Sequence, residues 1–351
     1  MDRPAGPLSV TVHDDLGEPG APSQVAREVA DLAARAERAL LGHTDFHYRA
    51  DTLAAYARDE DEPQLIILLR DAGEAVGFLH VFLPRHAHIV HVEATLDPGR
   101  DAQPLLDTLW PTFEDLCRRE ERTSLTWWES SRQDHPTLPA ATGVGAVESS
   151  AVTEWLRERG FVLDQVEVCS TLHLPVGVGE VDVDKHYEVV TWEGAMPERL
   201  LDGMARLRAR MSRDAPKGSR EGEERWDAAR IRRDEDMARR ARRSQLWAVA
   251  LAESGEPVGY TMIECPEGVP EIAYQMDTLV QPEDRGHGLG RALKQTNLAR
   301  LQALRPGVRR VHTWNAGENR WMLAINRGMG FVPSSAVGAW QRTDRAADLP
   351  R

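Results

Sequence analysis

The chain has 351 residues, of which 41% are hydrophobic and 28% charged, the proportions of an ordinary globular protein. At a domain size of about 150 residues, this length predicts two domains. The net charge of −13 argues against a protein that coats nucleic acid or an anionic membrane, and no apolar run reaches the ~20 residues of a membrane helix. The chain start lacks the features of a secretory signal, and three distant cysteines suggest neither disulfides nor a zinc site. We therefore expect a cytoplasmic protein that holds no metal and binds neither nucleic acid nor a membrane.

The first half alternates between strand and helix patterns. In chain order it predicts a strand at 8–13, a helix at 23–41 with Ser23 as its N-cap, a hairpin of strands at 64–69 and 75–83, a strand at 88–96, a helix at 105–119, a strand at 124–128, a helix at 152–159 and a strand from 161.

The second half repeats this order. It predicts a strand at 187–192, a polar helical region, strands at 246–252, 258–263 and 271–280, a helix at 290–304, a strand at 311–314, a helix at 321–328 and a final sheet segment from 331. The glycine-containing stretch 176–184 between the halves is the expected linker, so the predicted domains are 1–176 and 177–351.

Positive charge is concentrated in one part of the second half. Residues 199–243 carry 15 Lys and Arg against 9 Asp and Glu, so the rest of the chain is strongly acidic. The stretch 213–224 is too polar to be core and predicts a loop that leads into an arginine-rich helix at 226–243. That helix is either a solvated face or a border of an active or phosphate-binding site.

The most informative segment joins the strand at 271–280 to the helix that follows. It reads Val280-Gln-Pro-Glu-Asp-Arg-Gly-His-Gly-Leu-Gly-Arg-Ala-Leu293, with glycine at every second position from 286 to 290. Glycine permits tight turns and a close approach of the backbone to a ligand, and the unpaired N–H groups of a helix start attract phosphate. Arg285 and Arg291 add positive charge. We therefore expect a phosphate-binding loop, distinct in its spacing from the P-loop and from the dinucleotide fingerprint.

The whole string resembles the acetyl-CoA-binding motif of the GNAT superfamily of N-acetyltransferases, V-x-P-x-x-R-G-x-G-x-G-x-A-L, at every fixed position. Asn319, eleven residues before Gly330-Phe331, resembles a later motif of the family. The resemblance covers roughly 187–342, and the repeated element order extends it to the first half, as in tandem GNAT proteins such as mycothiol synthase. It implies an α/β fold of two tandem GNAT-like domains, each with a mixed, mostly antiparallel sheet flanked by helices.

The resemblance also implies how acetyl-CoA binds as cosubstrate. Leu279 and Val280 would pair their backbone with the pantetheine arm, as an added strand would, and Asn319 would contact the same arm. We expect His287 to face phosphate or solvent. The pyrophosphate would be held by the backbone amides of Arg285, Gly286, His287, Gly288, Leu289, Gly290 and Arg291.

The first half lacks an equivalent loop. Its aligned segment, 96–106, keeps Pro98 opposite Pro282 but has Asp101 opposite Arg285. The three glycines are replaced by Ala102, Pro104 and Leu106. An acid repels phosphate and a proline removes an amide donor. We therefore expect the first domain to be a structural or substrate-shaping partner without a CoA site, and the second domain to carry the chemistry.

Acyl transfer from a thioester needs a base for the acceptor and an acid for the departing thiolate. Many family members use a carboxylate as base and a tyrosine in the Asn-to-Gly-Phe helix as acid. Here Asn326 replaces that tyrosine, and its amide donates hydrogen bonds but is no acid at neutral pH, which argues against mycothiol synthase activity. Asp277 has either a catalytic or substrate role or makes a structural hydrogen bond. Glu264 is a second base candidate, and Tyr274 is a candidate acid, substrate contact or core residue.

Strand alternation would place Tyr274, Met276 and Thr278 on one face, and Gln275, Asp277 and Leu279 on the other. We expect Trp314 and Trp321 to pack within the fold, with a place for one of them in the lining of the acceptor pocket as the alternative.

The leading hypothesis is an acetyl-CoA-dependent N-acetyltransferase that acts on a small amine or a peptide amine, as a monomer or homodimer. The alternatives are a non-catalytic acyl-CoA-binding regulator, or an acyltransferase with another acyl group or a hydroxyl acceptor. The acidic background favours a cationic amine, whereas the arginine-rich helix favours an anionic acceptor or the CoA 3′-phosphate.

Overall fold

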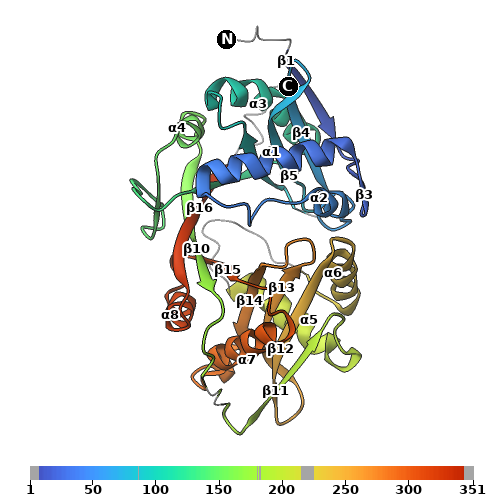
Figure 1. The fold of residues 1–351 in the computed structure, drawn as a ribbon, viewed down its shortest axis with the longest axis vertical. Helices are drawn as coiled ribbons and strands as arrows, with labels where there is room; N and C mark the ends of the chain where they lie inside the picture. The colour runs from blue at the N-terminus through green and yellow to red at the C-terminus, as the bar shows by residue number, and fades with distance from the viewer. Residues whose placement is uncertain (1–7, 86, 180, 182, 215–224, 344–351) are drawn as a thin grey trace. The chain divides into compact units, whose positions relative to one another are not determined.

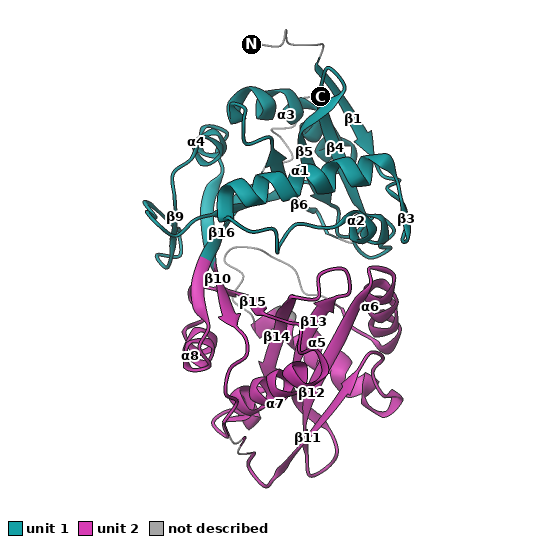
Figure 2. Cartoon of the chain, in the orientation of Figure 1, with its two compact units in different colours: residues 1–167, 335–351 teal, residues 168–334 magenta. Residues whose placement is uncertain are grey.

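The computed structural model describes residues 8–85, 87–179, 181, 183–214 and 225–343, and the chain folds into two compact units (Figures 1 and 2). Unit 1 comprises residues 1–167 and 335–351, and unit 2 comprises residues 168–334. Each unit has a mixed, mostly antiparallel sheet with helices packed against it, which confirms the predicted tandem α/β fold. Within the described ranges, no helix is long and apolar enough to cross a membrane.

The sheet of unit 1 has the strand order β1-β4-β5-β6-β7-β16, in which only β6 and β7 pair in parallel. The elements of the first half are β1 (Leu8–His13), β2 (Gly17–Glu18), β3 (Ala21–Pro22), α1 (Gln24–Leu41), α2 (Ala50–Tyr56), β4 (Gln64–Asp71), β5 (Glu74–Phe82), β6 (Ile89–Leu96), α3 (Ala102–Arg119), β7 (Ser124–Ser131), β8 (Leu138–Pro139), β9 (Ala146–Val147), α4 (Ala151–Glu158) and β10 (Val162–His173).

Strand β4 is buried on both faces, which explains its unbroken apolar run. Leu65, Ile67 and Leu69 pack into one core with α3 and α4, whereas Ile66 and Leu68 pack into another with α1 and α2. Helix α1 begins as predicted, because the Oγ of Ser23 accepts a hydrogen bond from the Ala26 amide. Helix α2 and the short hairpins β2–β3 and β8–β9 were not predicted, since elements this short carry little periodicity.

The sheet of unit 2 has the order β10-β15-β14-β13-β12-β11, in which β14 and β15 pair in parallel. The elements of the second half are β11 (Tyr187–Glu193), η1 (Glu198–Leu200), α5 (Leu201–Asp214), α6 (Ala228–Arg240), β12 (Arg243–Ala252), β13 (Pro257–Pro266), β14 (Ile272–Val280), η2 (Pro282–Asp284), α7 (Leu289–Leu304), β15 (Arg310–Ala316), α8 (Arg320–Gly328) and β16 (Val332–Thr343).

Helices cover both faces of the unit 2 sheet. Trp247 and Val249 of β12 pack into a core with α5 and α6, whereas the alternate residues Leu246 and Ala248 pack toward α7. The predicted arginine-rich helix is α6, which ends three residues before β12 begins at Arg243. The predicted polar loop falls mainly on residues outside the described ranges.

Two arginines of α6 pair with acids. Arg232 forms ion pairs with Glu198 at 2.7 Å and Glu235 at 2.8 Å, and Arg239 pairs with Asp236 at 2.5 Å. The positive charge of this helix is therefore partly neutralised by its own neighbours.

Two long strands, β10 and β16, decide where the units divide. Residues 336–343 of β16 pair antiparallel with 131–124 of β7 over eight consecutive positions, so the C-terminal strand completes the sheet of unit 1. Residues 168–173 of β10 belong to unit 2, where Leu172 lies in the core. The two compact units therefore differ from the expected domains 1–176 and 177–351: residues 168–176 belong to unit 2, and residues 335–351 belong to unit 1.

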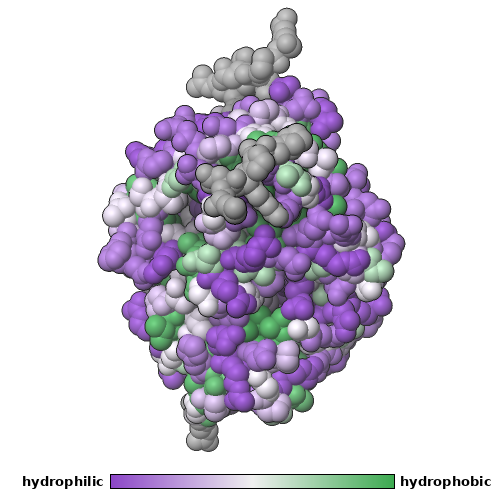
Figure 3. Space-filling view, turned by 45° about the horizontal axis from the view of Figure 1, so that its top comes forward, coloured by the Kyte–Doolittle hydropathy of each residue, from purple (hydrophilic) through white to green (hydrophobic). Residues whose placement is uncertain are grey.

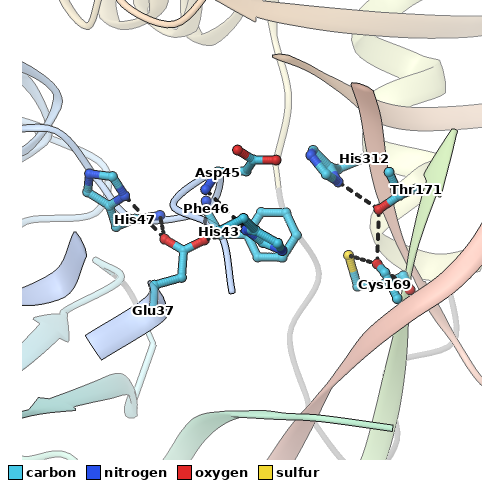
Figure 4. A network of polar contacts seen from close by, with 9 residues as sticks. Glu37, His43, Asp45, Phe46, His47, Cys169, Thr171 and His312 are labelled. Carbon is cyan, nitrogen blue, oxygen red and sulfur yellow. Dashed lines mark hydrogen bonds and ion pairs between the residues drawn. The ribbon is translucent and has the colours of Figure 1, made fainter. Parts of the chain in front are cut away.

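Each unit contains a cluster of polar contacts, drawn in Figure 4. In unit 1, the Glu37 carboxylate accepts hydrogen bonds from the amides of Phe46 and His47, both at 2.8 Å, and contacts the rings of His43 and His47. Burial alone would raise the pKa of Glu37, but these hydrogen bonds dominate and lower it to about 2. This carboxylate fixes the turn that follows α1.

In unit 2, side chains fasten β10 to β15. The Thr171 hydroxyl lies 2.9 Å from Nδ1 of the buried His312 and donates to Ser334 Oγ at 3.0 Å, and Ser334 in turn contacts Cys169. Strand β10 is therefore anchored in unit 2 by buried polar contacts as well as by its apolar residues.

The face of the molecule shown in Figure 3 is mainly hydrophilic, with hydrophobic residues in small separate groups. Among the described residues, large exposed hydrophobic side chains are few, and Trp321 is the most exposed of them at 74%. The prediction that Trp321 packs within the fold is wrong, because the residue lies in the exposed first turn of α8.

Candidate active site

The glycine loop leads from the end of β14, through η2, into α7. Gly286 has φ +92° and Gly288 has φ +72°, a left-handed backbone that side-chain-bearing residues rarely adopt. Gly288 is also the N-cap of α7. Gly290 has ordinary backbone angles, and a Cβ atom there would meet only Ile325 and Val280, at 3.7 and 3.9 Å. The backbone conformation therefore requires glycine at positions 286 and 288, whereas glycine at position 290 leaves open space beside the start of α7.

Five consecutive backbone amides of this loop are available to a ligand. The N–H groups of residues 286–290 donate to no backbone acceptor among the described residues, whereas the amides of Arg291 and Ala292 bond to the Gly288 carbonyl at 3.1 Å. The first N–H groups of a helix have no partner within the helix, and they carry a partial positive charge. The loop thus presents the amides expected of an anion site.

The charged side chains of the loop are held in place. Arg285 donates from Nε to the Val280 carbonyl at 2.9 Å and forms an ion pair with Asp214 at 3.0 Å. His287 contacts Asp184 through Nδ1 at 2.8 Å. These contacts fix both side chains at the surface of the loop.

Asp184 also accepts a hydrogen bond from the backbone. The amide of His186 donates to Asp184 Oδ1 at 3.1 Å. This bond, followed by the contact with the His287 ring, lowers the pKa of Asp184. The carboxylate is therefore ionised at neutral pH and orients the His287 ring.

The strand before the loop is irregular at the point where it leaves its neighbour. Strand β14 pairs with β15 only from Ile272 to Tyr274, and in the described structure no register pairs connect the two strands beyond Tyr274. On its other side, β14 shifts register against β13 between Gln275 and Thr278. This bulge leaves backbone groups of β14 outside the regular ladder, close to the point where β14 and β15 part.

The bulge overturns the expected alternation of side chains. Gln275 donates to Thr261 Oγ1 at 2.8 Å, and Thr278 contacts the same hydroxyl at 2.7 Å, so these two residues share one face. Asp277 and Leu279 lie on the opposite face, where Leu279 packs in the core with Tyr260. The prediction that Gln275 shares a face with Asp277 is wrong, because the extra residue of a bulge resets the alternation.

Asp277 lies in a polar group on the side of the sheet that α5 covers. Tyr260 Oη donates to Asp277 Oδ2 at 3.4 Å. The guanidinium of Arg208 forms an ion pair with Asp234 at 2.6 Å. Burial alone would lower the pKa of Arg208, but Asp234, Tyr260 and Asp277 together raise it. Asp277 therefore faces a permanent positive charge at the end of β14.

Glu264 and Tyr274 belong to a different group. Glu264 is 6% exposed and forms a buried ion pair with Arg243, whose guanidinium also lies 5.6 Å from the centre of the Tyr274 ring. A carboxylate in such a pair is occupied by its partner. Tyr274 is 7% exposed and contacts the Trp314 ring, which matches the core role that was one of its alternatives.

The two asparagines of α8 are both engaged. Asn319 caps the helix, since its Oδ1 accepts a hydrogen bond from the Met322 amide at 3.2 Å. Asn326 is buried and donates from Nδ2 to Asn315 Oδ1 at 2.6 Å. Its own Oδ1 is buried and has no hydrogen-bond partner among the described residues.

A cavity of about 430 Å³ adjoins the loop within unit 2. It is lined by Gly288, Arg291 and Gln295 of the loop and α7, by 176–179, and by Met329 after α8. The exposed Arg291 thus borders, together with Gly288 of the loop, a space large enough for part of a ligand.

Sequence reasoning did not single out Lys294, Arg208 or Tyr260. Lys294 lies four residues before the apolar Leu298 on α7, a spacing that places it on the inward face. Leu304, expected on the apolar side of the same helix, is 43% exposed because it occupies the last turn.

Comparison with known proteins agrees with this geometry. Residues 207–331 match the Acetyltransferase (GNAT) family. This part of the chain is a GNAT acetyltransferase domain. It contains the glycine loop, the bulged strand and α8, and it makes the protein an acyltransferase.

The whole chain shares its fold with tandem GNAT proteins. A tandem GNAT protein from the clavulanic acid biosynthesis pathway, solved without acetyl-CoA, has a TM-score of 0.76 at 23% identity, covering 96% of this chain and 98% of that one. A GCN5-related N-acetyltransferase from Sphaerobacter thermophilus has a TM-score of 0.65 at 17% identity, covering 95% of each chain. No curated protein matches the chain in sequence.

Proposed function

We propose that unit 2 transfers an acetyl group from acetyl-CoA to an amine of a small molecule or peptide. The observation that carries this proposal is the run of five loop amides, from Gly286 to Gly290 at the start of α7, that have no backbone acceptor among the described residues. A pyrophosphate fits such a run, because it accepts several N–H hydrogen bonds at once and is favoured by the helix dipole. When bound, acetyl-CoA would supply the activated thioester.

Other residues would hold the remaining parts of the cosubstrate. Leu279 and Val280 would pair their backbone with the pantetheine arm; the end of β14–β15 pairing at Tyr274 supports this assignment. Asn319 stands at the start of α8 and keeps its amide nitrogen as a donor. Arg291 would contact the nucleotide end in the adjoining cavity.

Asp277 is the group we assign as general base. It stands at the bulge, where the two strands part, and its carboxylate lies beside Tyr260 and the cation of Arg208. A carboxylate in this position can take a proton from an ammonium acceptor and orient the amine toward the thioester. A backbone N–H at the bulge, of Met276 or Asp277, would polarise the acyl carbonyl by donating to its oxygen, since the carbonyls of these two residues accept from Gln275 and Thr261.

Unit 1 would serve as a structural or substrate-shaping partner without a CoA site, and the chemistry would belong to the C-terminal domain. Its aligned loop, described throughout 96–106, has no glycine with a left-handed backbone, and Pro104 lacks an N–H group. The three cysteines are buried, and in the described structure none of them forms a disulfide, which supports a reducing compartment such as the cytoplasm.

The test is release of free thiol from acetyl-CoA in the presence of a panel of primary amines, with cationic amines and peptides included. We expect release above the rate of hydrolysis without acceptor, for at least one amine. Tight CoA binding without release for any acceptor would instead favour an acyl-CoA-binding regulator. Release with hydroxyl acceptors alone would favour an O-acyltransferase.

A further inference from the structure

The chain contains a lysine that is fully buried in unit 2. Of 43 basic residues, only Lys185, Lys217 and Lys294 are lysines. Lys294 is 1% exposed. An arginine remains charged in any protein environment, whereas a lysine can release its proton when buried. The deeply buried amine of α7 is thus of the type that can donate and recover a proton.

Lys294 faces the region between α7, α8 and the end of β14. It lies four residues after Gly290, so both occupy the same face of α7. At Gly290 that face meets Val280 of β14 and Ile325 of α8. Lys294 is one helical turn further from the phosphate loop, in the direction that a pantetheine arm beside β14 would run.

The surroundings of the Lys294 amine contain no counter-charge among the described residues. Nζ lies 3.9 Å from Met322 Sδ and 5.7 Å from the centre of the Phe331 ring. Burial is the single cause that lowers the pKa of Lys294, to about 7. At neutral pH both protonation states are therefore populated.

A second polar side chain, Asn326 of α8, lies on the helix face that carries Met322. Asn326 follows Met322 by four residues, so the two side chains are neighbours on that helix. The Oδ1 atom of Asn326 is buried without a hydrogen-bond partner in the described part of the chain. The resemblance to the GNAT motifs implies a tyrosine acid at this position, which Asn326 replaces. Met322 thus has the buried amine of Lys294 on one side and the buried acceptor of Asn326 one helical turn away on α8.

We propose that Lys294 is the acid that protonates the departing CoA thiolate, with Asn326 as its positioning residue; this inference rests on the proposed function. As the acceptor nitrogen forms its bond to the acyl carbon, the C–S bond breaks and sulfur takes the electron pair. The proton lost by the amine goes to Asp277, and an N–H proton of Lys294 goes to sulfur. The products are an amide and a thiol; Asp277 then releases its proton to solvent, and neutral Lys294 takes one up, so both groups return to their starting states.

The first experiment needs no acceptor. The thiol of bound CoA is titrated by the ultraviolet absorbance of its thiolate, in the wild type, in Lys294→Met and in the exposed-site control Lys185→Met. We expect the bound thiol to ionise at lower pH in the wild type and Lys185→Met than in Lys294→Met, because the ammonium stabilises the thiolate. Equal thiol pKa values in all three proteins would overturn the proposal.

The second experiment follows turnover and CoA affinity in the same proteins. Lys294→Met should lose about 100-fold or more in kcat, the range of general acid catalysis, while the Kd for CoA changes little. Asn326→Tyr in the Lys294→Met protein should restore part of the loss. Unchanged kcat in Lys294→Met would reject Lys294 alone, whereas absent CoA binding or turnover in the wild type would reject the proposed function itself.

Discussion

The two aligned loops, 96–106 in unit 1 and 280–290 in unit 2, show what distinguishes a phosphate-binding turn from an ordinary one. In unit 2, the amides of 286–290 have no backbone acceptor among the described residues, and two glycines adopt left-handed angles. In unit 1, Asp97 binds its own loop: its Oδ1 accepts from the Gly99 amide at 2.9 Å and its carbonyl accepts from the Arg100 amide at 3.1 Å. The Arg100 bond has an equivalent in unit 2, where the Asp284 amide donates to the Gln281 carbonyl at 3.0 Å. The two loops therefore differ in the left-handed glycines of unit 2, and in the side-chain cap and Pro104 of unit 1.

The strands that lead into these two loops, β6 in unit 1 and β14 in unit 2, differ in how regularly they pair with their neighbours. Strand β6 pairs with β5 from His91 to Leu96 without a register shift, and with β7 over five positions. Strand β14 bulges and pairs with β15 over only three. The comparison indicates that a CoA site needs both a strand that parts from its parallel neighbour and a loop with left-handed glycines. Four predictions test this interpretation.

The largest effect should come from cutting the chain at the linker. Residues 177–351 lack Thr171 and Leu172 of β10, which are buried in unit 2, so we expect no cooperative thermal unfolding. Residues 162–334 keep that strand and should unfold cooperatively. Circular dichroism melts of both fragments measure this, and cooperative melting of 177–351 would show that β10 is dispensable.

The carboxylates before the two loops should differ in catalysis. Asp277→Asn should lower kcat by about 10²–10⁴-fold, because general base catalysis has that range. Glu93→Gln, at the aligned position of unit 1, should leave kcat unchanged. Thiol release under saturating acetyl-CoA measures both, and equal losses in the two variants would contradict the assignment of chemistry to unit 2.

The loops themselves can be compared with matched prolines. Gly288→Pro removes an available amide and cannot adopt φ +72°, so the loop loses its ligand-binding geometry and CoA affinity should fall about 100-fold or more. Gly99→Pro removes one amide from the unit 1 loop and should leave affinity unchanged. Calorimetric titration with CoA gives both values; loss of affinity in Gly99→Pro would point to a second site.

The smallest effect is an opposite pH dependence of stability in the two units. Burial raises the pKa of Glu129 to about 8, so the folded state binds more protons than the unfolded state above pH 4.5, and stability falls as pH rises through 8. Burial lowers the pKa of Lys294 to about 7, so the unfolded state binds more protons and stability rises from pH 7 toward 10.5.

Two variants separate these contributions. The gain in Tm from Glu129→Gln should grow between pH 6 and pH 9, whereas the gain from Lys294→Met should shrink over the same interval. Differential scanning calorimetry at both pH values measures the gains. A gain that does not depend on pH would contradict the titration of that group.

Much of the architecture was predictable because its signals are local. The N-cap Ser23, the buried run of β4, and the glycines that end α4 and α8 at Gly160 and Gly330 each depend on a few neighbouring residues. Glu264 was a candidate base on its position alone, and its pairing with Arg243 could not be predicted, because the two residues meet across a strand pair set by register.

Local sequence was sufficient for the duplicated α/β order and for the loop from Val280 to Leu293, since glycine angles and helix starts follow from short stretches of chain. Other features emerged only in the folded chain: β16 completes unit 1, the bulge turns Asp277 toward Tyr260, and Lys294 is buried without a counter-charge among the described residues. These features depend on strand pairing and helix packing between residues far apart in the chain, which no local pattern records.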